Sequence, residues 1–178
     1  MSQVVDELLA AEANRTEMTC FSARDMGFDL EQAYAYQREL IDRKVAAGDS
    51  VVGAKLGLTS KAKQAQMNVN EPGYGVLMAS GWLAPEEPVP FDQLIHPRIE
   101  PEIVFHIAED IEGPGITGAD VLDATAGISC GIEVIDSRYA AFKFTLPDVV
   151  ADNTSAARYP FGTQMVHPRD IPSIPHLG

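Results

Sequence analysis

The sequence predicts an α+β fold with a mixed or antiparallel sheet. Helical spacing of apolar residues is concentrated in the first 48 residues, whereas strand patterns are scattered over residues 51–178 without a regular strand–helix–strand alternation. The length of 178 residues, with 46% hydrophobic and 22% charged residues, is typical of one globular domain. We therefore expect a single domain over residues 1–178, with a helical part at 1–48 and a β-rich part at 51–178.

Two helices are expected in the N-terminal part. Residues 3–13 place apolar side chains on one face at helical spacing. Asp29 and Gln32 have the spacing of a capping box, and the apolar positions after them keep the helical period until Gly48 ends it. We interpret both segments as helices that pack on the core.

Three longer strands are expected in the β-rich part. Residues 51–58 alternate, so that Lys55 shares one face with two glycines while apolar residues occupy the other face. Residues 98–107 and 128–135 predict two further strands. One face of the 98–107 strand is apolar and is expected to lie against the core; it consists of Ile99, Ile103, Phe105 and Ile107.

Shorter elements connect these strands. Ser60 can cap a short helix that runs to Met67, and the proline-rich residues 85–90 are typical of a loop. Residues 119–126 predict a short helix, and residues 148–178 predict turns with short extended pieces.

Composition and charge exclude several classes of protein. With 26 acidic and 13 basic side chains the net charge is −13, which disfavours binding to nucleic acid or to an anionic membrane. The apolar runs fall far short of the ~20 residues of a membrane span. Two cysteines form no disulfide framework, so we expect a reducing, cytoplasmic location, with Cys130 as a buried structural thiol.

Three glutamates are candidate metal ligands. Glu100 and Glu102 lie two residues apart, so both project from one face of the expected strand. Glu133 is a lone carboxylate in an otherwise apolar strand. Converging carboxylates repel one another unless a cation neutralises them, and oxygen ligands suit Mg²⁺ or Mn²⁺. The alternative is a solvated strand face, because spacing does not show whether Glu133 reaches the pair.

Basic and polar candidates are less distinctive. Lys55 lies between glycines, where a ligand can approach its ammonium group, but it also fits an edge strand at the surface. Arg138 can hold a substrate carboxylate by its fork or form a local salt bridge with Asp136 or Asp148. The polar residues 152–155 can hydrogen-bond a ligand or simply form a turn.

Four ordered segments together resemble a known family. They are Val52-Gly53-Ala54-Lys55-Leu56-Gly57-Leu58-Thr59, His96-Pro97-Arg98-Ile99-Glu100-Pro101-Glu102, Glu133-Val134-Ile135-Asp136-Ser137-Arg138 and Val150-Ala151-Asp152-Asn153. The likeness runs from about residue 30 to the end. It is to the hydratase/decarboxylase branch of the fumarylacetoacetate hydrolase superfamily, which holds 2-oxopent-4-enoate hydratases and 4-oxalocrotonate decarboxylases of aromatic meta-cleavage pathways.

The resemblance implies a site and a fold. It implies that Glu100, Glu102 and Glu133 bind Mg²⁺ or Mn²⁺, and that Lys55 is the catalytic lysine beside a chelated 2-oxo acid. It also implies a strongly curved mixed β-sheet or β-roll behind the N-terminal helices. The residues expected to bind substrate are Arg138, Tyr74 and Ser155.

Within the branch, two features favour a decarboxylase. Residues 137–139 and 142–144 resemble the decarboxylases, and Gly73 stands before Tyr74 where hydratases typically carry an acid. The expected reaction is metal-dependent decarboxylation of 4-oxalocrotonate (2-oxo-3-hexenedioate) to 2-hydroxypenta-2,4-dienoate. The alternatives are a hydratase that adds water to 2-hydroxypentadienoate, and a non-catalytic partner subunit.

The resemblance also bears on assembly. It implies a homo-oligomer and a complex with the pathway hydratase. Family members continue past a segment like His176-Leu177-Gly178, so we expect the domain to be incomplete at this end. A form of this length is expected to leave apolar sheet surface uncovered.

Overall fold

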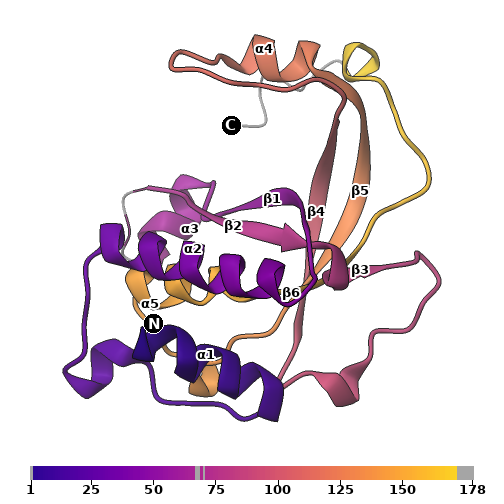
Figure 1. The fold of residues 1–178 in the computed structure, drawn as a ribbon. Coiled ribbons are helices and arrows are strands. Elements are labelled where there is room, and N and C mark those ends of the chain that lie inside the picture. Colours follow the sequence, from indigo (N-terminus) through magenta and orange to yellow (C-terminus); the bar gives the residue numbers. More distant parts are fainter. Residues whose placement is uncertain (1, 67–68, 70, 172–178) are drawn as a thin grey trace.

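The computed structural model describes residues 2–66, 69 and 71–171, and it confirms an α+β fold with a mixed sheet (Figure 1). The helices and strands, in chain order, are α1 (Gln3–Asn14), α2 (Leu30–Ala46), β1 (Val51–Gly57), α3 (Lys61–Gln66), β2 (Gly73–Met78), β3 (Trp82–Leu83), β4 (Arg98–Ile107), α4 (Gly118–Asp123), β5 (Thr125–Ile135), α5 (Leu146–Ala151) and β6 (Ala156–Pro160). Single 3₁₀ turns lie between several of them. The expected end of the short helix at Met67 lies outside the described residues.

The two N-terminal helices form where the sequence predicts them. Ser2 caps α1 by accepting a hydrogen bond from the Val4 amide. Asp29 and Gln32 form the expected capping box at the start of α2, with 2.8 Å between the Gln32 nitrogen and an Asp29 carboxylate oxygen. Local signals therefore determine where both helices begin.

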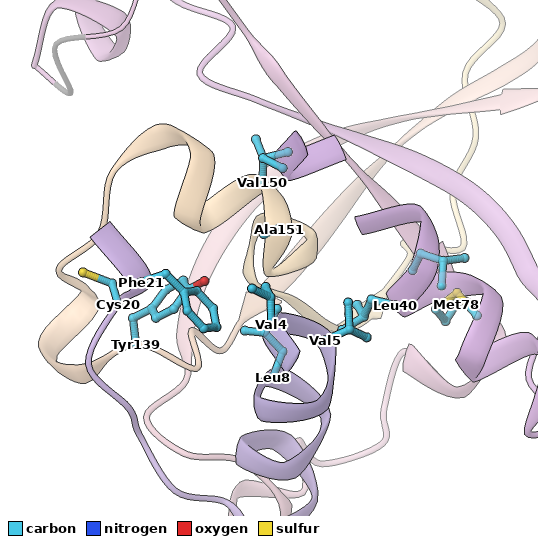
Figure 2. Close-up of a cluster of buried hydrophobic side chains, with 12 residues drawn as sticks. Val4, Val5, Leu8, Cys20, Phe21, Leu40, Met78, Tyr139, Val150 and Ala151 are labelled. Atoms are coloured by element: carbon cyan, nitrogen blue, oxygen red, sulfur yellow. The ribbon is translucent and has the colours of Figure 1, made fainter. Parts of the chain in front are cut away.

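The main hydrophobic core lies where these helices meet α5 (Figure 2). Tyr139 is fully buried and packs edge to face on Phe21, and its hydroxyl donates to the Asp148 carbonyl at 2.9 Å. The buried aliphatic side chains around this pair include Val4, Val5, Leu8, Leu40, Met78 and Val150. The core thus ties α1 and α2 to the segment that follows β5.

The strands form two sheets. β1 and β2 make an antiparallel hairpin, and the second sheet has the order β3-β6-β5-β4. Its β3–β6 pair is parallel and its other pairs are antiparallel, so the sheet is mixed. β4 and β5 form a long ribbon that extends from the helical body toward α4 (Figure 1).

Several element boundaries, and one helix, differ from the sequence expectation. β5 begins at Thr125 rather than at residue 128, and α4 ends at Asp123, because pairing of Thr125 with Ile107 extends the ribbon. The helix α5 begins at Leu146 and runs into the segment from residue 148 on that was expected to form turns and extended pieces. With six residues it is too short for a periodic apolar pattern, although Thr145 and Asp148 give it a capping box.

The apolar face of β4 does not lie against the core, so that prediction was wrong. Ile99 is 65% exposed and Ile103 is 56% exposed. Cys130, which pairs with Ile103, is exposed rather than buried. The reason is geometric: α1, α2 and α5 pack at one end of the ribbon, and the ribbon extends beyond them toward α4 (Figure 1). Among the described residues, no helix has both the length and the apolar character to cross a membrane.

Asp148 stabilises the start of α5. Its carboxylate accepts hydrogen bonds from the Thr145 amide at 2.9 Å and from the Ser22 hydroxyl at 2.5 Å. Burial alone would raise the pKa of Asp148, but these bonds hold it below its usual value.

The Asp148→Asn substitution is therefore expected to lower the free energy of unfolding by about 2 kcal/mol at pH 7. A lowered folded-state pKa stabilises the protein above the unfolded-state pKa and loses this effect as pH falls through the folded value. Urea unfolding at pH 7 and below pH 4 should show the difference between the two proteins shrinking in acid. A difference that is the same at both pH values would contradict the assignment.

Candidate metal and substrate site

The structure brings the three candidate glutamates together. Ligand oxygens of Glu100, Glu102 and Glu133 all lie within 4.8 Å of one another. The cause is the register of the ribbon: Glu100 of β4 is directly opposite Glu133 of β5, and Glu102 follows Glu100 on the same face. The convergence that spacing alone left open is thus produced by strand pairing.

Glu133 is the buried member of this cluster. It is 4% exposed, whereas Glu100 is half-buried and Glu102 is exposed. Burial raises the pKa of Glu133, the ammonium of Lys55 opposes this shift, and the charges of Glu102 and Glu100 add to it. Its Oε1 atom is buried without a hydrogen-bond partner among the described residues.

The cluster fits a hard divalent cation. The three carboxylates place their oxygen ligands close together. A buried carboxylate oxygen without a partner destabilises the protein unless a cation or a hydrogen-bond donor binds it. Oxygen-only ligation is the preference of Mg²⁺ and Mn²⁺.

Lys55 lies beside the cluster. Its Nζ atom is 2.8 Å from Glu133 Oε2 and donates a hydrogen bond to the Thr154 carbonyl at 3.2 Å. The side chain is 11% exposed, so the ammonium is partly removed from water. The structure therefore brings Lys55 of β1 to the glutamate cluster on the ribbon, through its contact with Glu133.

Gly75 makes room for this arrangement. It pairs with Lys55 across the hairpin, and a Cβ atom at this position would lie 2.2 Å from the Thr154 hydroxyl oxygen. Real Cβ atoms do not approach so closely. The sequence alone does not show why residue 75 is a glycine. The reason follows from the pairing of Gly75 with Lys55 and from the close approach of Thr154.

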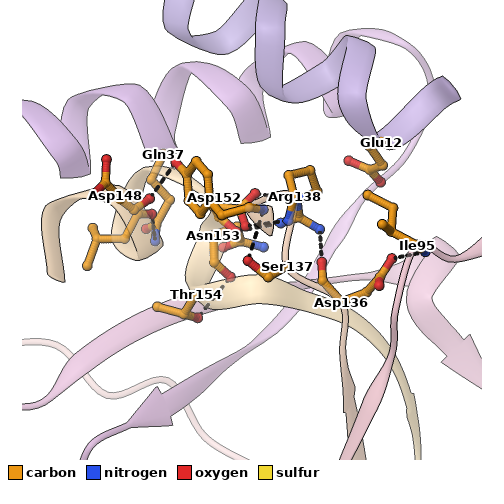
Figure 3. A network of polar contacts seen from close by, with 12 residues as sticks. Glu12, Gln37, Ile95, Asp136, Ser137, Arg138, Asp148, Asp152, Asn153 and Thr154 are labelled. Atoms are coloured by element: carbon orange, nitrogen blue, oxygen red, sulfur yellow. Dashed lines mark hydrogen bonds and ion pairs between the residues drawn. The ribbon is translucent and has the colours of Figure 1, made fainter. Parts of the chain in front are cut away.

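Arg138 is placed differently from the sequence expectation. It is 4% exposed, its Nε atom donates to the Asp152 carboxylate, and its Nη1 atom donates to the Asp136 carbonyl at 2.9 Å (Figure 3). The salt bridge is thus with Asp152, rather than with Asp136 or Asp148. Burial raises the pKa of Asp152 to about 6 against the opposing charge of Arg138. The guanidinium is therefore used within the protein and does not reach the glutamates.

Tyr74 and Ser155 have contrasting surroundings. Tyr74 is next to Gly75 in β2, so its side chain projects from the hairpin face opposite to Lys55, where it stacks on Tyr34 with 4.5 Å between ring centroids. The structure does not bring Tyr74 to the cluster. Ser155 follows Thr154, is 2% exposed, and its hydroxyl is buried without a partner among the described residues.

The chain was compared with known proteins. No family model matches it. It is 38% identical over 172 residues to the 2-hydroxypent-2,4-dienoate hydratase of Pseudomonas putida, covering 96% of this chain and 78% of that one. It is 46% identical over 147 residues to the 4-oxalocrotonate decarboxylase of Pseudomonas sp. (strain CF600), covering 83% of this chain and 55% of that one.

A solved structure agrees with these relatives. The 4-oxalocrotonate decarboxylase from Pseudomonas putida G7, complexed with magnesium and adipate, matches with a TM-score of 0.89 and 37% sequence identity. The match covers 94% of this chain and 64% of that chain, so the chain spans between 55% and 64% of the length of these decarboxylases. The match to the hydratase is long, and the fold agrees with that of the decarboxylase. The chain therefore belongs to the family of the 2-hydroxypentadienoate hydratases and 4-oxalocrotonate decarboxylases, as the four sequence motifs predict.

Proposed function

We propose that the protein is a lyase that decarboxylates 4-oxalocrotonate to 2-hydroxypenta-2,4-dienoate and carbon dioxide, with Mg²⁺ or Mn²⁺ as cofactor. The observation that carries the proposal is the cluster of Glu100, Glu102 and Glu133 with the Lys55 ammonium 2.8 Å from Glu133. Magnesium in the solved decarboxylase supports the choice of cation. The catalytic domain is taken to span residues 1–178 and to share the curved mixed sheet of the fumarylacetoacetate hydrolase superfamily.

Each group in the site has a chemical role. A divalent cation held by the three carboxylates supplies Lewis-acid chemistry for a 2-oxo acid. Lys55 carries a positive charge in a partly desolvated place, so it stabilises negative charge that develops on the substrate as the distal carboxylate leaves. The same ammonium can hold the proton that the product's dienol oxygen needs.

The hydratase alternative rests on one observation. The hydratase relative is matched over a larger share of its own length than the decarboxylases are. Against it, Gly73 supplies no carboxylate next to Tyr74, and the stronger identity is to a decarboxylase.

Two substrates separate these functions. Purified protein with Mg²⁺ is incubated with 4-oxalocrotonate, following release of carbon dioxide, and with 2-hydroxypentadienoate, following loss of the diene absorbance. Release of carbon dioxide supports the decarboxylase. Hydration of the diene without release of carbon dioxide would replace the proposal with the hydratase, and activity only after addition of the pathway hydratase would indicate a partner subunit.

Ser155 is the substrate-binding residue that its surroundings support best. Its buried hydroxyl has no partner among the described residues, as expected for a group that binds the substrate carboxylate. Ser155→Ala is expected to raise KM by about 3–10-fold with a smaller change in kcat, since one neutral hydrogen bond is worth about 1 kcal/mol. Steady-state kinetics test this, and an unchanged KM would remove Ser155 from the site. Tyr74 and Arg138 are committed to internal contacts, so we assign them packing and positioning.

We also propose that the protein works in the cytoplasm as a homo-oligomer that associates with the pathway hydratase. The two unpaired cysteines support the location. The exposed apolar face of β4 supports contact with further polypeptide. Light scattering with and without the hydratase measures both associations.

A further inference from the structure

The loop behind Lys55 has an unusual backbone. Asn153, Thr154 and Ser155 all have left-handed conformations, with φ angles of 49°, 49° and 60°, and none of them is glycine. Each such residue costs about 1 kcal/mol or more, so a run of three persists only where the surroundings fix it. This segment, Asn153–Ser155, is called the lysine loop below.

A buried ion pair fixes the start of the lysine loop. Asp152 is fully buried, and its carboxylate accepts from both the backbone nitrogen and the Nε atom of Arg138 (Figure 3). The other end of the guanidinium, Nη2, donates to the Asp152 carbonyl. The last residue of the loop is tied as well, because the Ser155 carbonyl accepts from the Asp136 amide at 2.8 Å.

Strand β2 holds the first two residues of the loop. The Asn153 side chain accepts a hydrogen bond from the Val76 amide at 2.8 Å and donates one to the Val76 carbonyl at 2.9 Å. It thus makes the two hydrogen bonds that the backbone of a neighbouring strand would make with Val76. Gly75, the residue before, lets Thr154 approach the hairpin where a Cβ atom would stop it. The loop is therefore held from both sides, by Arg138 and by β2.

The lysine loop contacts the Lys55 ammonium through a carbonyl oxygen. The Thr154 carbonyl accepts a hydrogen bond from Lys55 Nζ, which among the described residues also contacts Glu133 Oε2. A lysine side chain has four rotatable bonds, and two acceptors on different elements restrict its ammonium far more than one.

We propose that the buried Arg138–Asp152 ion pair is a positioning device for Lys55, which acts through the lysine loop and the Thr154 carbonyl. The inference deepens the proposed function, because it takes Lys55 as the catalytic lysine. It also gives Arg138 a role distinct from substrate binding: Arg138 positions the lysine and does not touch the reacting atoms.

The test measures how accessible the Lys55 amine is. Folded protein without metal is pulse-labelled with an amine-reactive ester, and mass spectrometry gives the labelling rate of Lys55 relative to the exposed Lys61. In Asp152→Asn and Arg138→Lys the loop loses its fixed start, so the relative rate should rise about 5-fold or more. An unchanged rate in folded variants would overturn the proposal.

Asp148→Asn is the matched control. Asp148 is also buried in α5, and its loss also destabilises the protein, but its contacts are to Ser22 and Thr145 rather than to the lysine loop. Its relative Lys55 rate should stay within about 2-fold of wild type. A rise equal to that of Asp152→Asn would show that general loosening, and not the loop, exposes Lys55, and would overturn the proposal.

Gly75→Ala tests the same device without removing a charge, in case the Asp152 and Arg138 variants fail to fold. The new Cβ atom meets the Thr154 hydroxyl and pushes the loop from β2. The Lys55 rate should rise, and adding Thr154→Gly should return it part of the way, because the main clash is then gone while the Asn153 carbonyl remains 2.9 Å from the new atom. Wild-type labelling in Gly75→Ala would contradict the proposal. Since labelling needs no turnover, these results stand or fall separately from the decarboxylase activity.

Discussion

Lys55→Met is expected to lower kcat for decarboxylation by about three orders of magnitude, the usual contribution of a positioned proton-transfer or charge-stabilising group. Methionine keeps a similar length and removes only the charge and the hydrogen-bond donors. The Lys55 ammonium contacts Glu133 but supplies no oxygen ligand, so the substitution should leave the three carboxylates in place. Affinity for Mn²⁺ should therefore be equal to or above that of wild type.

Comparing kcat with metal affinity separates catalysis from binding. Calorimetry gives the affinity for Mn²⁺, and carbon dioxide release gives kcat at saturating metal. Lys143→Met is the matched control, because Lys143 is an exposed lysine outside the site. If Lys55→Met keeps more than about a tenth of the wild-type kcat, Lys55 is not the catalytic lysine.

Local chemistry explains which parts of the fold the sequence predicts. The capping residues of α1 and α2 mark where these helices begin, and the strand at 98–107 has the bounds of β4. The orientation of the β4 apolar face follows instead from where the helices pack, which alternation cannot show. This apolar face was expected to pack against the core. It is exposed because the ribbon extends past the helices that form the core.

Local sequence patterns likewise predict some features of the site, whereas others depend on tertiary contacts. The shared face of Glu100 and Glu102 follows from the two-residue period of a strand. The position of Glu133 beside these two residues depends on the register of the β4–β5 ribbon. That register is set by the pairing of two strands that a long connection separates in the sequence. The partner of Arg138 depends on a tertiary contact with Asp152, so sequence proximity pointed to the wrong aspartates. The polar residues 152–155 predict a turn, but without a glycine nothing in the sequence shows that three successive residues are left-handed.

Glu133→Gln is expected to lower the affinity for Mn²⁺ on the order of 1,000-fold, because one unit charge about 4 Å away is worth about 4 kcal/mol at an effective dielectric constant of 20 and the amide supplies a weaker ligand. The substitution also removes the partner of Lys55, leaving an ammonium that is 11% exposed without its counter-charge. Breaking a buried pair costs more than the pair contributes, so the metal-free protein should unfold at lower denaturant concentration.

Glu102→Gln is the matched control, since it removes the same charge from the exposed member of the cluster. It too should weaken Mn²⁺ binding, but it leaves the Lys55–Glu133 contact intact, so it should lower metal-free stability less than Glu133→Gln does. Calorimetry measures the affinities and urea unfolding measures the stabilities. Wild-type affinity in both variants would show that the metal binds elsewhere. Equal loss of stability in both would show that the Lys55–Glu133 contact contributes nothing in the absence of metal. A larger loss of stability in Glu133→Gln than in Glu102→Gln, with a loss of affinity in both, is what a cluster with one buried, lysine-paired ligand requires.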